Sequence, residues 1–195
     1  MRRDEFICTD TKILETMLNS ITFGTMIIPD VRPYGVPISF AYENEQIYFH
    51  GARAGRKYEL LKHNPPVSFS AVKPYAYIPS TFLHNTMIPT QFFFSVYVEG
   101  QFLVVEDFER KKQILKALVK KYENRDIDME KSPFKGQEKG VFIGVIKAQN
   151  ISVKAKFGQN LKKEAFFTIM QDLENRDGIL DKETLELMRY FQKNF

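Results

Sequence analysis

The chain has 195 residues, of which 44% are hydrophobic and 27% are charged, and its formal net charge is +4. Length and composition are typical of a soluble globular protein with one main domain. Basic and acidic residues are interleaved along the chain, so the sequence pI of about 9.0 favours small anionic ligands over nucleic acid.

A single cysteine, Cys8, leaves no partner for an intrachain disulfide or for a zinc site with several cysteines, which fits a reducing compartment. The first residues, Met-Arg-Arg-Asp-Glu-Phe, lack the apolar core of a signal peptide. No stretch reaches the ~18 apolar residues that a membrane-spanning helix requires. We therefore expect a cytoplasmic protein that binds neither membranes nor nucleic acid.

The first third of the chain predicts one helix followed by strands. Asp10 or Thr11 can cap a helix that runs through Asn19, because apolar residues recur at helical spacing after it. Strands are predicted at 23–28, 34–42 and 46–51, with a polar turn at 43–45.

The remaining two thirds predict longer strands and helices. A strand at 67–72 is followed at 73–90 by a segment with three prolines, which predicts a long aromatic loop. The residues after this loop predict a strand at 91–105 and a helix that Glu106 and Asp107 open and that runs through Tyr122, with an apolar stripe on one side and lysines on the other. A polar segment at 124–139 follows, then a strand at 141–156 interrupted near Asn150, and two helices from Leu161 that are separated by Asp177 and Gly178.

This element order predicts the fold class. Many strands with few strict strand-helix-strand alternations favour a mainly β protein of the α+β class, with an antiparallel barrel and flanking helices. Closure into a barrel would remove the exposed sheet edges.

The stretch from Gln46 to Pro66 contains an electrostatic anomaly. A strand ends at Gly51, and a helix follows in which basic residues crowd the N-terminal turn: Arg53, Arg56 and Lys57. The helix dipole is positive at this end, so each cation there should cost a few tenths of a kcal/mol. A bound phosphate would offset that cost, because the helix end also offers unpaired N–H groups.

Other interpretations of these residues stay open. A histidine at a strand end, such as His50, is more often hydrogen-bonded to backbone than to a ligand. Arg56 and Lys57 could instead pair with Glu59 and Glu109 on the surface. The three histidines of the chain lack metal-ligand spacing, and the Walker, Rossmann and nucleophile-elbow patterns are absent.

Several short motifs together resemble one known family. Tyr-Phe-His-Gly-Ala at 48–52, Gly-Arg-Lys at 55–57 and Leu-Leu-Lys-His-Asn-Pro-Pro-Val-Ser-Phe at 60–69 are similar to the pyridoxamine 5'-phosphate oxidase-like FMN-binding split barrels, in particular to the nitroimidazole-resistance (Nim-type) branch. The segments at 32–40 and 92–96 agree with this resemblance, as does Lys-x-Lys-x-x-Gln-Asn at 154–160. The resemblance covers about residues 1–160.

The resemblance implies a flavoprotein with FMN in a groove between the two barrels of a homodimer. Residues 1–160 would form the FMN-binding split barrel, and residues 161–195 a C-terminal helical extension packed on the barrel or the dimer. Ser39 points away from Ile38 in the predicted strand. The implied cofactor-binding residues are Pro37, Ile38 and Ser39 along the isoalloxazine ring, His50, Arg56 and Lys57 at the phosphate, and Ser95 on the central strand. Phe93 replaces a tyrosine expected in this pattern, and no catalytic acid or base is nominated.

The expected function is an FMN-dependent oxidoreductase. Electrons would pass from a reduced nicotinamide, NADH or NADPH, to a small oxidised acceptor of nitro or quinone type. The aromatic segment from Tyr75 to Met87 is the expected acceptor pocket. The alternative is a split-barrel protein that binds flavin or haem without turnover, with His50 or His84 as conceivable haem ligands.

Overall fold

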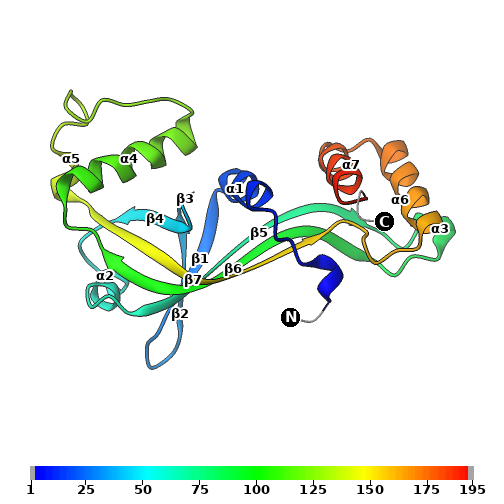
Figure 1. Ribbon diagram of the computed structural model, residues 1–195, viewed down its shortest axis with the longest axis horizontal. Helices are drawn as coiled ribbons and strands as arrows, with labels where there is room; N and C mark the ends of the chain where they lie inside the picture. The colour runs from blue at the N-terminus through cyan, green and yellow to red at the C-terminus, as the bar shows by residue number, and fades with distance from the viewer. Residues whose placement is uncertain (1–2, 193–195) are drawn as a thin grey trace. The chain divides into compact units, whose positions relative to one another are not determined.

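The computed structural model describes residues 3–192, which form a mainly β fold with flanking helices (Figure 1). Its strands make one seven-stranded sheet in the order β2-β1-β5-β6-β7-β4-β3, and the registered pairs are antiparallel. The predicted fold class, an antiparallel split barrel with flanking helices, is confirmed.

The strands and helices have the following bounds. The strands are β1 (Phe23–Ile28), β2 (Tyr34–Ser39), β3 (Ala41–Glu43), β4 (Gln46–Gly51), β5 (Pro66–Ile78), β6 (Thr90–Val104) and β7 (Phe142–Lys156). The helices are the short 3-10 turn η1 (Asp4–Phe6), α1 (Thr11–Ser20), α2 (Arg56–Leu61), α3 (Phe82–Asn85), α4 (Phe108–Glu123), α5 (Gln137–Gly140), α6 (Lys163–Arg176) and α7 (Ile179–Gln192).

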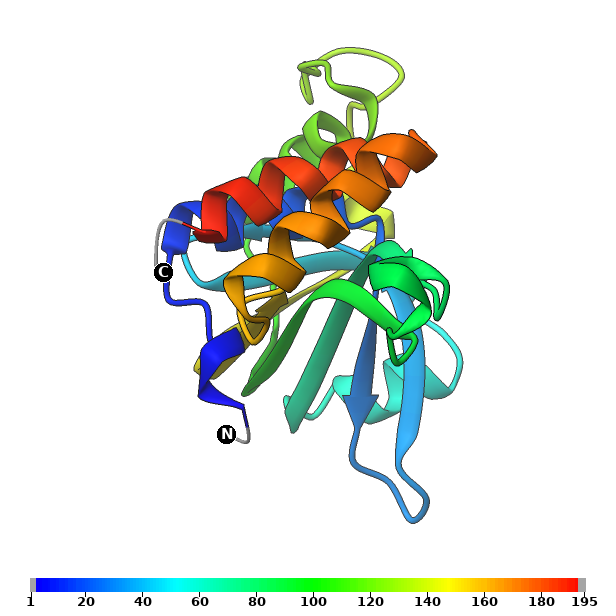
Figure 2. The same ribbon diagram turned by 90° about the vertical axis from the view of Figure 1, so that its right-hand side faces the viewer.

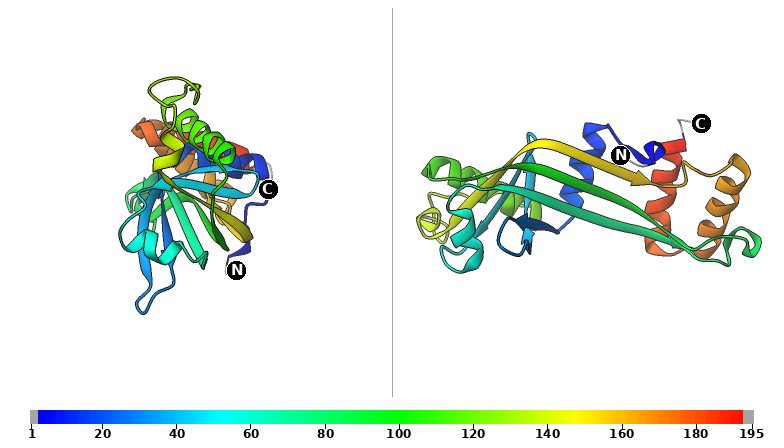
Figure 3. Two further views of the ribbon diagram at one scale, coloured as in Figure 1. Left: turned by 90° about the vertical axis from the view of Figure 1, so that its left-hand side faces the viewer. Right: turned by 90° about the horizontal axis from the view of Figure 1, so that it is seen from below.

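Contacts divide the chain into two compact units. One, here called the barrel unit, comprises Asp10–Ala71 and Val96–Ser152. The other, here called the hairpin unit, comprises Met1–Thr9, Val72–Ser95 and Val153–Phe195. The long strands β5, β6 and β7 are neighbours in the sheet and contribute residues to both units (Figure 3). The boundary predicted at residue 160 stays a prediction.

The two faces of β4 organise the core of the barrel unit. Phe49 points to an aromatic cluster in which its ring centroid lies 5.8 Å from that of Phe102 and 6.2 Å from that of Phe142. Gly144 of β7 is paired with Phe49 of β4. A Cβ atom at residue 144 would lie 2.2 Å from the Phe102 ring, so only glycine leaves room for this ring. Tyr48 points the other way, into an apolar cluster with residues of α4. Side chains therefore alternate between an aromatic core and the α4 face along β4.

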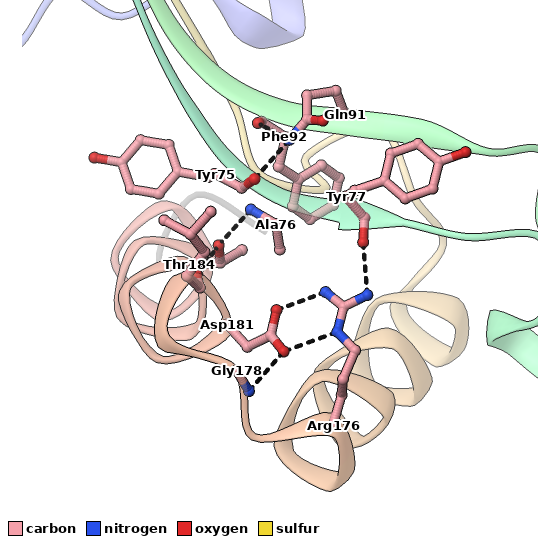
Figure 4. Close-up of polar contacts among 10 residues, drawn as sticks. Tyr75, Ala76, Tyr77, Gln91, Phe92, Arg176, Gly178, Asp181 and Thr184 are labelled. Atoms are coloured by element: carbon pink, nitrogen blue, oxygen red, sulfur yellow. Dashed lines mark hydrogen bonds and ion pairs between the residues drawn. The ribbon is translucent and has the colours of Figure 1, made fainter.

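In the hairpin unit, the two antiparallel helices α6 and α7 lie beside the C-terminal part of β5. Figure 2 shows α6 and α7 running side by side, and the break between them lies at Asp177 and Gly178 as predicted. The backbone N–H of Ala76 donates to the hydroxyl of Thr184 at 2.9 Å (Figure 4). β1 pairs with β5 only from Ser68 to Ser70. The N–H of Ala76 lies beyond that pairing, and the Thr184 hydroxyl of α7 accepts its hydrogen bond in place of a neighbouring strand.

A buried ion pair closes the same hairpin. Asp181, whose side chain is 3% exposed, accepts hydrogen bonds from the Arg176 guanidinium at 2.5 and 2.8 Å and from the Gly178 N–H at 2.9 Å. Arg176 also donates to the backbone oxygen of Tyr77 on β5 at 2.9 Å (Figure 4). The pair thereby fastens both helices to the strand.

Most predicted elements are confirmed, including the cap of α1 at Asp10 and the start of α4 beside Asp107. The Asp10 carboxylate accepts from two N–H groups of α1, and the Asp107 carboxylate accepts from the N–H of Arg110 in α4. The predicted strand at 34–42 is broken at Phe40 into β2 and β3.

The predicted loop at 73–90 is wrong for residues 73–78, because β5 continues through Pro74 to Ile78, whereas residues 79–89 connect β5 to β6 with one short helical turn. Proline is tolerated there because β1 offers no ladder partner beyond Ser70. The break expected near Asn150 is also absent, and β7 is continuous.

Candidate functional site

The junction between β4 and α2 forms as the sequence predicts. β4 ends at Gly51, and Gly55 precedes the helix with a φ of 85°, a conformation that strains residues with a Cβ. Arg56 and Lys57 are the first two residues of α2. This places both cations in the first helical turn, where the backbone adds partial positive charge.

Arg56 has an anionic partner that the sequence did not suggest. Its guanidinium donates two hydrogen bonds to the Asp30 carboxylate, at 2.7 and 3.1 Å, and lies 4.4 Å from the ring centroid of Tyr34. The guanidinium of Arg56 holds the pKa of Asp30 below its usual value, with help from the Val31 N–H. Glu59 and Glu109, the partners considered from sequence, instead pair with Lys62 and Lys112.

Arg53 is also partnered. Its guanidinium lies 3.7 Å from the carboxylate of Glu106 and donates to the backbone oxygen of Val141 at 3.4 Å. Two of the three cations at this junction therefore have a carboxylate within ion-pair distance.

Lys57 is the exception. No hydrogen bond or ion pair is recorded for it among residues 3–192, although its side chain is half-buried. The ammonium lies 5.5 Å from the ring centroid of Phe49 and close to the backbone of Gly51. Burial lowers the pKa of Lys57, and a bound anion would reverse that penalty.

His50 lies at the same strand end but points to the other face of β4. Together with residues of α4 it lines an apolar cavity, whereas Lys57 lies over Phe49 on the aromatic-core side. Burial lowers the pKa of His50, and the positive charge of Lys57 lowers it further. The imidazole is therefore neutral at pH 7 and can both donate and accept a hydrogen bond.

The family of the chain follows from a comparison of its sequence with models of known families. Residues 16–154 match the model described as pyridoxamine 5'-phosphate oxidase. The chain belongs to this family. The match spans all of β1 to β4, and with them the cationic junction, which agrees with the resemblance drawn from the motifs. A search of curated proteins gave no match.

Solved structures with the same fold include flavin proteins. A candidate 5-nitroimidazole antibiotic resistance protein from Bacteroides thetaiotaomicron is 20% identical with a TM-score of 0.63, and the alignment covers 76% of this chain and 85% of that one. The flavocytochrome Anf3 from Azotobacter vinelandii is 18% identical with a TM-score of 0.64, covering 86% and 77%. A FAD and haem binding protein from Mycobacterium smegmatis is 17% identical with a TM-score of 0.64, covering 83% and 78%. At these identities the likeness concerns the fold.

The other predicted cofactor residues of this family member lie on β2 and β6. In β2, Ile38 is buried, Ser39 is half-buried and Pro37 is exposed, which agrees with the predicted alternation. Ser95 is half-buried on β6 and belongs to the hairpin unit, whereas the other predicted residues belong to the barrel unit. The assignment of these residues to a cofactor stays a prediction.

Sequence reasoning overlooked two features, one at the junction and one on α4. Asp30 follows β1 and is 26 residues from Arg56, and no motif connects them. Lys121 of α4 donates to the backbone oxygen of Leu18 at 3.1 Å and lies 3.7 Å from the ring centroid of Phe40. Burial lowers its pKa to about 8. The pattern of the helix predicts its lysines on the polar side, and only the contact of Lys121 with Leu18 of α1 reveals the burial of this one.

None of the helices in the described part of the chain is both long and apolar enough to cross a membrane.

Proposed function

We propose that the protein is an FMN-dependent oxidoreductase that passes electrons from a reduced nicotinamide, NADH or NADPH, to a small oxidised acceptor of nitro or quinone type. The observation that carries this proposal is Lys57, a half-buried cation without a recorded anionic partner at the strand-helix junction. Membership of the pyridoxamine 5'-phosphate oxidase family and a fold shared with flavin-binding proteins support it.

The residues at the junction fit a phosphate. Lys57 would hold one phosphate oxygen with a charge-assisted hydrogen bond, and Arg56 would reach the phosphate by exchanging or sharing its bond to Asp30. The Arg56 side chain is 54% exposed, so this exchange would cost little packing. His50 points to the opposite face of β4, so the phosphate contacts that we propose are those of Lys57 and Arg56.

When bound, FMN supplies the two-electron redox chemistry, and the chain supplies binding and orientation. Pro37, Ile38 and Ser39 would align the ring along β2, and Ser95 would contact it from β6. We further propose a homodimer with FMN at the subunit interface. The exposure of Pro37 and of Phe23, which is 60% exposed on the neighbouring β1, supports a covering partner at this sheet edge.

The decisive experiment compares FMN with riboflavin, which lacks the phosphate. Lys57→Ala should weaken FMN about tenfold or more, because a charge-assisted bond is worth ~1.5 to 3 kcal/mol, and should leave riboflavin nearly unchanged. Arg56→Ala should have a smaller effect, because Asp30 already satisfies that guanidinium. Lys62→Ala, which removes a cation from the end of α2 that pairs with Glu59, is the matched control.

Isothermal titration of each variant with both ligands gives the affinities. Equal losses for FMN and riboflavin in Lys57→Ala would overturn the phosphate assignment. Bleaching of bound flavin by NADH or NADPH without oxygen, followed by recovery on adding a quinone, tests the oxidoreductase activity.

The second candidate is a split-barrel protein that binds flavin or haem without turnover. The Mycobacterium smegmatis protein with this fold binds FAD and haem, which favours this second candidate. Bound flavin that neither nicotinamide reduces, or a Soret band on adding haemin, would support this candidate against the first.

A further inference from the structure

The barrel unit contains an apolar cavity of about 360 Å³ that the cofactor residues other than His50 do not line. Its walls come from β4, from α4, from the segment 124–136 and from α5. The lining residues are His50, Leu115, Leu118, Val119, Ile127, Met129, Pro133, Phe134 and Gln137.

The residues that line this cavity are mostly apolar. Only His50 and Gln137 bring polar side-chain groups, and the other lining residues are aliphatic, aromatic, proline or methionine. Water in such a space would find few hydrogen-bond partners, so the cavity favours a molecule with an apolar body. Its volume lies at the small end of ligand pockets, which suits a compound of one or two rings.

The two polar residues are both exposed to solvent, and their side chains can receive one hydrogen-bonding group of a bound molecule. The Nε2 of Gln137 donates to the backbone oxygen of Pro133 at 3.4 Å, and no partner is recorded for its side-chain oxygen among the described residues. His50 is neutral because burial and Lys57 lower its pKa, so it can act as donor or acceptor.

We propose that this cavity binds a planar aromatic molecule of one or two rings with a single hydrogen-bonding substituent directed to His50 and Gln137. Only the identification of this molecule as the electron acceptor rests on the proposed function. The acceptor pocket then lies beside α4 and not at Tyr75–Met87, where Tyr75 is buried and its ring packs 5.0 Å from that of Phe157.

The test uses fluorescent 2-naphthol with the complete chain, first without flavin. Val119→Phe fills the cavity and should weaken 2-naphthol binding about tenfold or more, because the added ring takes the space of the probe. Val72→Phe adds the same ring at a position that is 53% exposed and outside the cavity, and should leave binding unchanged. Equal affinity in wild type and Val119→Phe, or equal loss in both variants, would overturn the proposal.

Two additions keep the test decisive. Ile127→Phe blocks the cavity from the segment 124–136, so the result does not depend on how α4 tolerates Val119→Phe. Naphthalene lacks the hydroxyl and should bind several-fold more weakly than 2-naphthol, and His50→Leu should remove most of that difference. An unchanged preference in His50→Leu would overturn the assigned orientation.

The two proposals can fail separately. Binding of 2-naphthol by a chain that never binds FMN would leave the cavity assignment intact and overturn the oxidoreductase. In FMN-loaded protein, Val119→Phe should raise the KM for 1,4-naphthoquinone and leave flavin reduction by the nicotinamide unchanged. Loss of both steps together would overturn the identification of the occupant as the acceptor.

Discussion

Two arginine-aspartate pairs, one in each unit, have similar bond lengths and different surroundings. Arg176 and Asp181 meet at 2.5 and 2.8 Å in the hairpin unit, and Arg56 and Asp30 meet at 2.7 and 3.1 Å in the barrel unit. The Asp181 side chain is 3% exposed, against 26% for that of Asp30.

The difference in exposure indicates that the Arg176–Asp181 pair stabilises the fold, whereas the Arg56–Asp30 pair can exchange its partner. The buried pair makes further hydrogen bonds to Gly178 and Tyr77. Removing one member of the pair would therefore leave the other member buried without its partner. The pair at the surface has solvent beside it, and exposed pairs contribute little to stability. An incoming phosphate could therefore compete for Arg56 but not for Arg176.

The largest expected effect comes from Asp181→Asn. Loss of the charge leaves Arg176 with a weaker partner and should cost ~2 to 4 kcal/mol of unfolding free energy, less than a fully buried pair because the guanidinium is 36% exposed. Urea denaturation measures this loss. Asp177→Asn, which removes a carboxylate that is 71% exposed and paired with Lys182, is the control and should leave stability unchanged.

The loss of unfolding free energy in Asp181→Asn should depend on pH. Arg176 lowers the pKa of Asp181, so the folded carboxyl binds a proton less readily than the unfolded one. Its stabilisation is therefore complete above the ordinary aspartate range near pH ~4 and is lost as pH falls through the lower folded pKa. Wild type and Asp181→Asn should converge at acid pH, and a constant gap between them would contradict the assignment.

A smaller effect is expected from Thr184→Val, which deletes the hydroxyl that receives the Ala76 N–H. Thr184 is fully buried, so the variant should lose ~1 to 3 kcal/mol of unfolding free energy and speed amide exchange at Ala76. Thr184→Ser keeps the hydroxyl and should retain slow exchange. Fast exchange in both variants would show that packing of the methyl group, and not the hydrogen bond, protects the strand edge.

The smallest effect on stability is expected from Asp30→Asn. The variant should unfold like wild type, because the pair is exposed, and should bind FMN a few-fold more tightly, because Arg56 no longer has a competing carboxylate. Riboflavin affinity should not change. A loss of unfolding free energy comparable with that of Asp181→Asn would contradict the claim that the Arg56–Asp30 pair contributes little to stability.

Local signals were sufficient for most of the fold and part of the site. The cap at Asp10, the helix start beside Asp107, the break at Gly178 and the cations at the start of α2 all depend on neighbours a few residues away. Pro74 misled the prediction, because proline disfavours a central strand but not a stretch whose neighbouring strand has ended.

Arg56 and Lys57 were predicted at a helix start crowded by positive charge, and the structure places them there. Tertiary structure decided their partners: Asp30 comes from a distant turn to bind Arg56, while Lys57 lies over Phe49 without a carboxylate. It also decided that His50 lines an apolar cavity, because α4 and the segment 124–136 pack on that face of β4. Periodicity and capping are local properties, whereas contacts between residues far apart in the chain exist only once the strands have paired and the helices have packed.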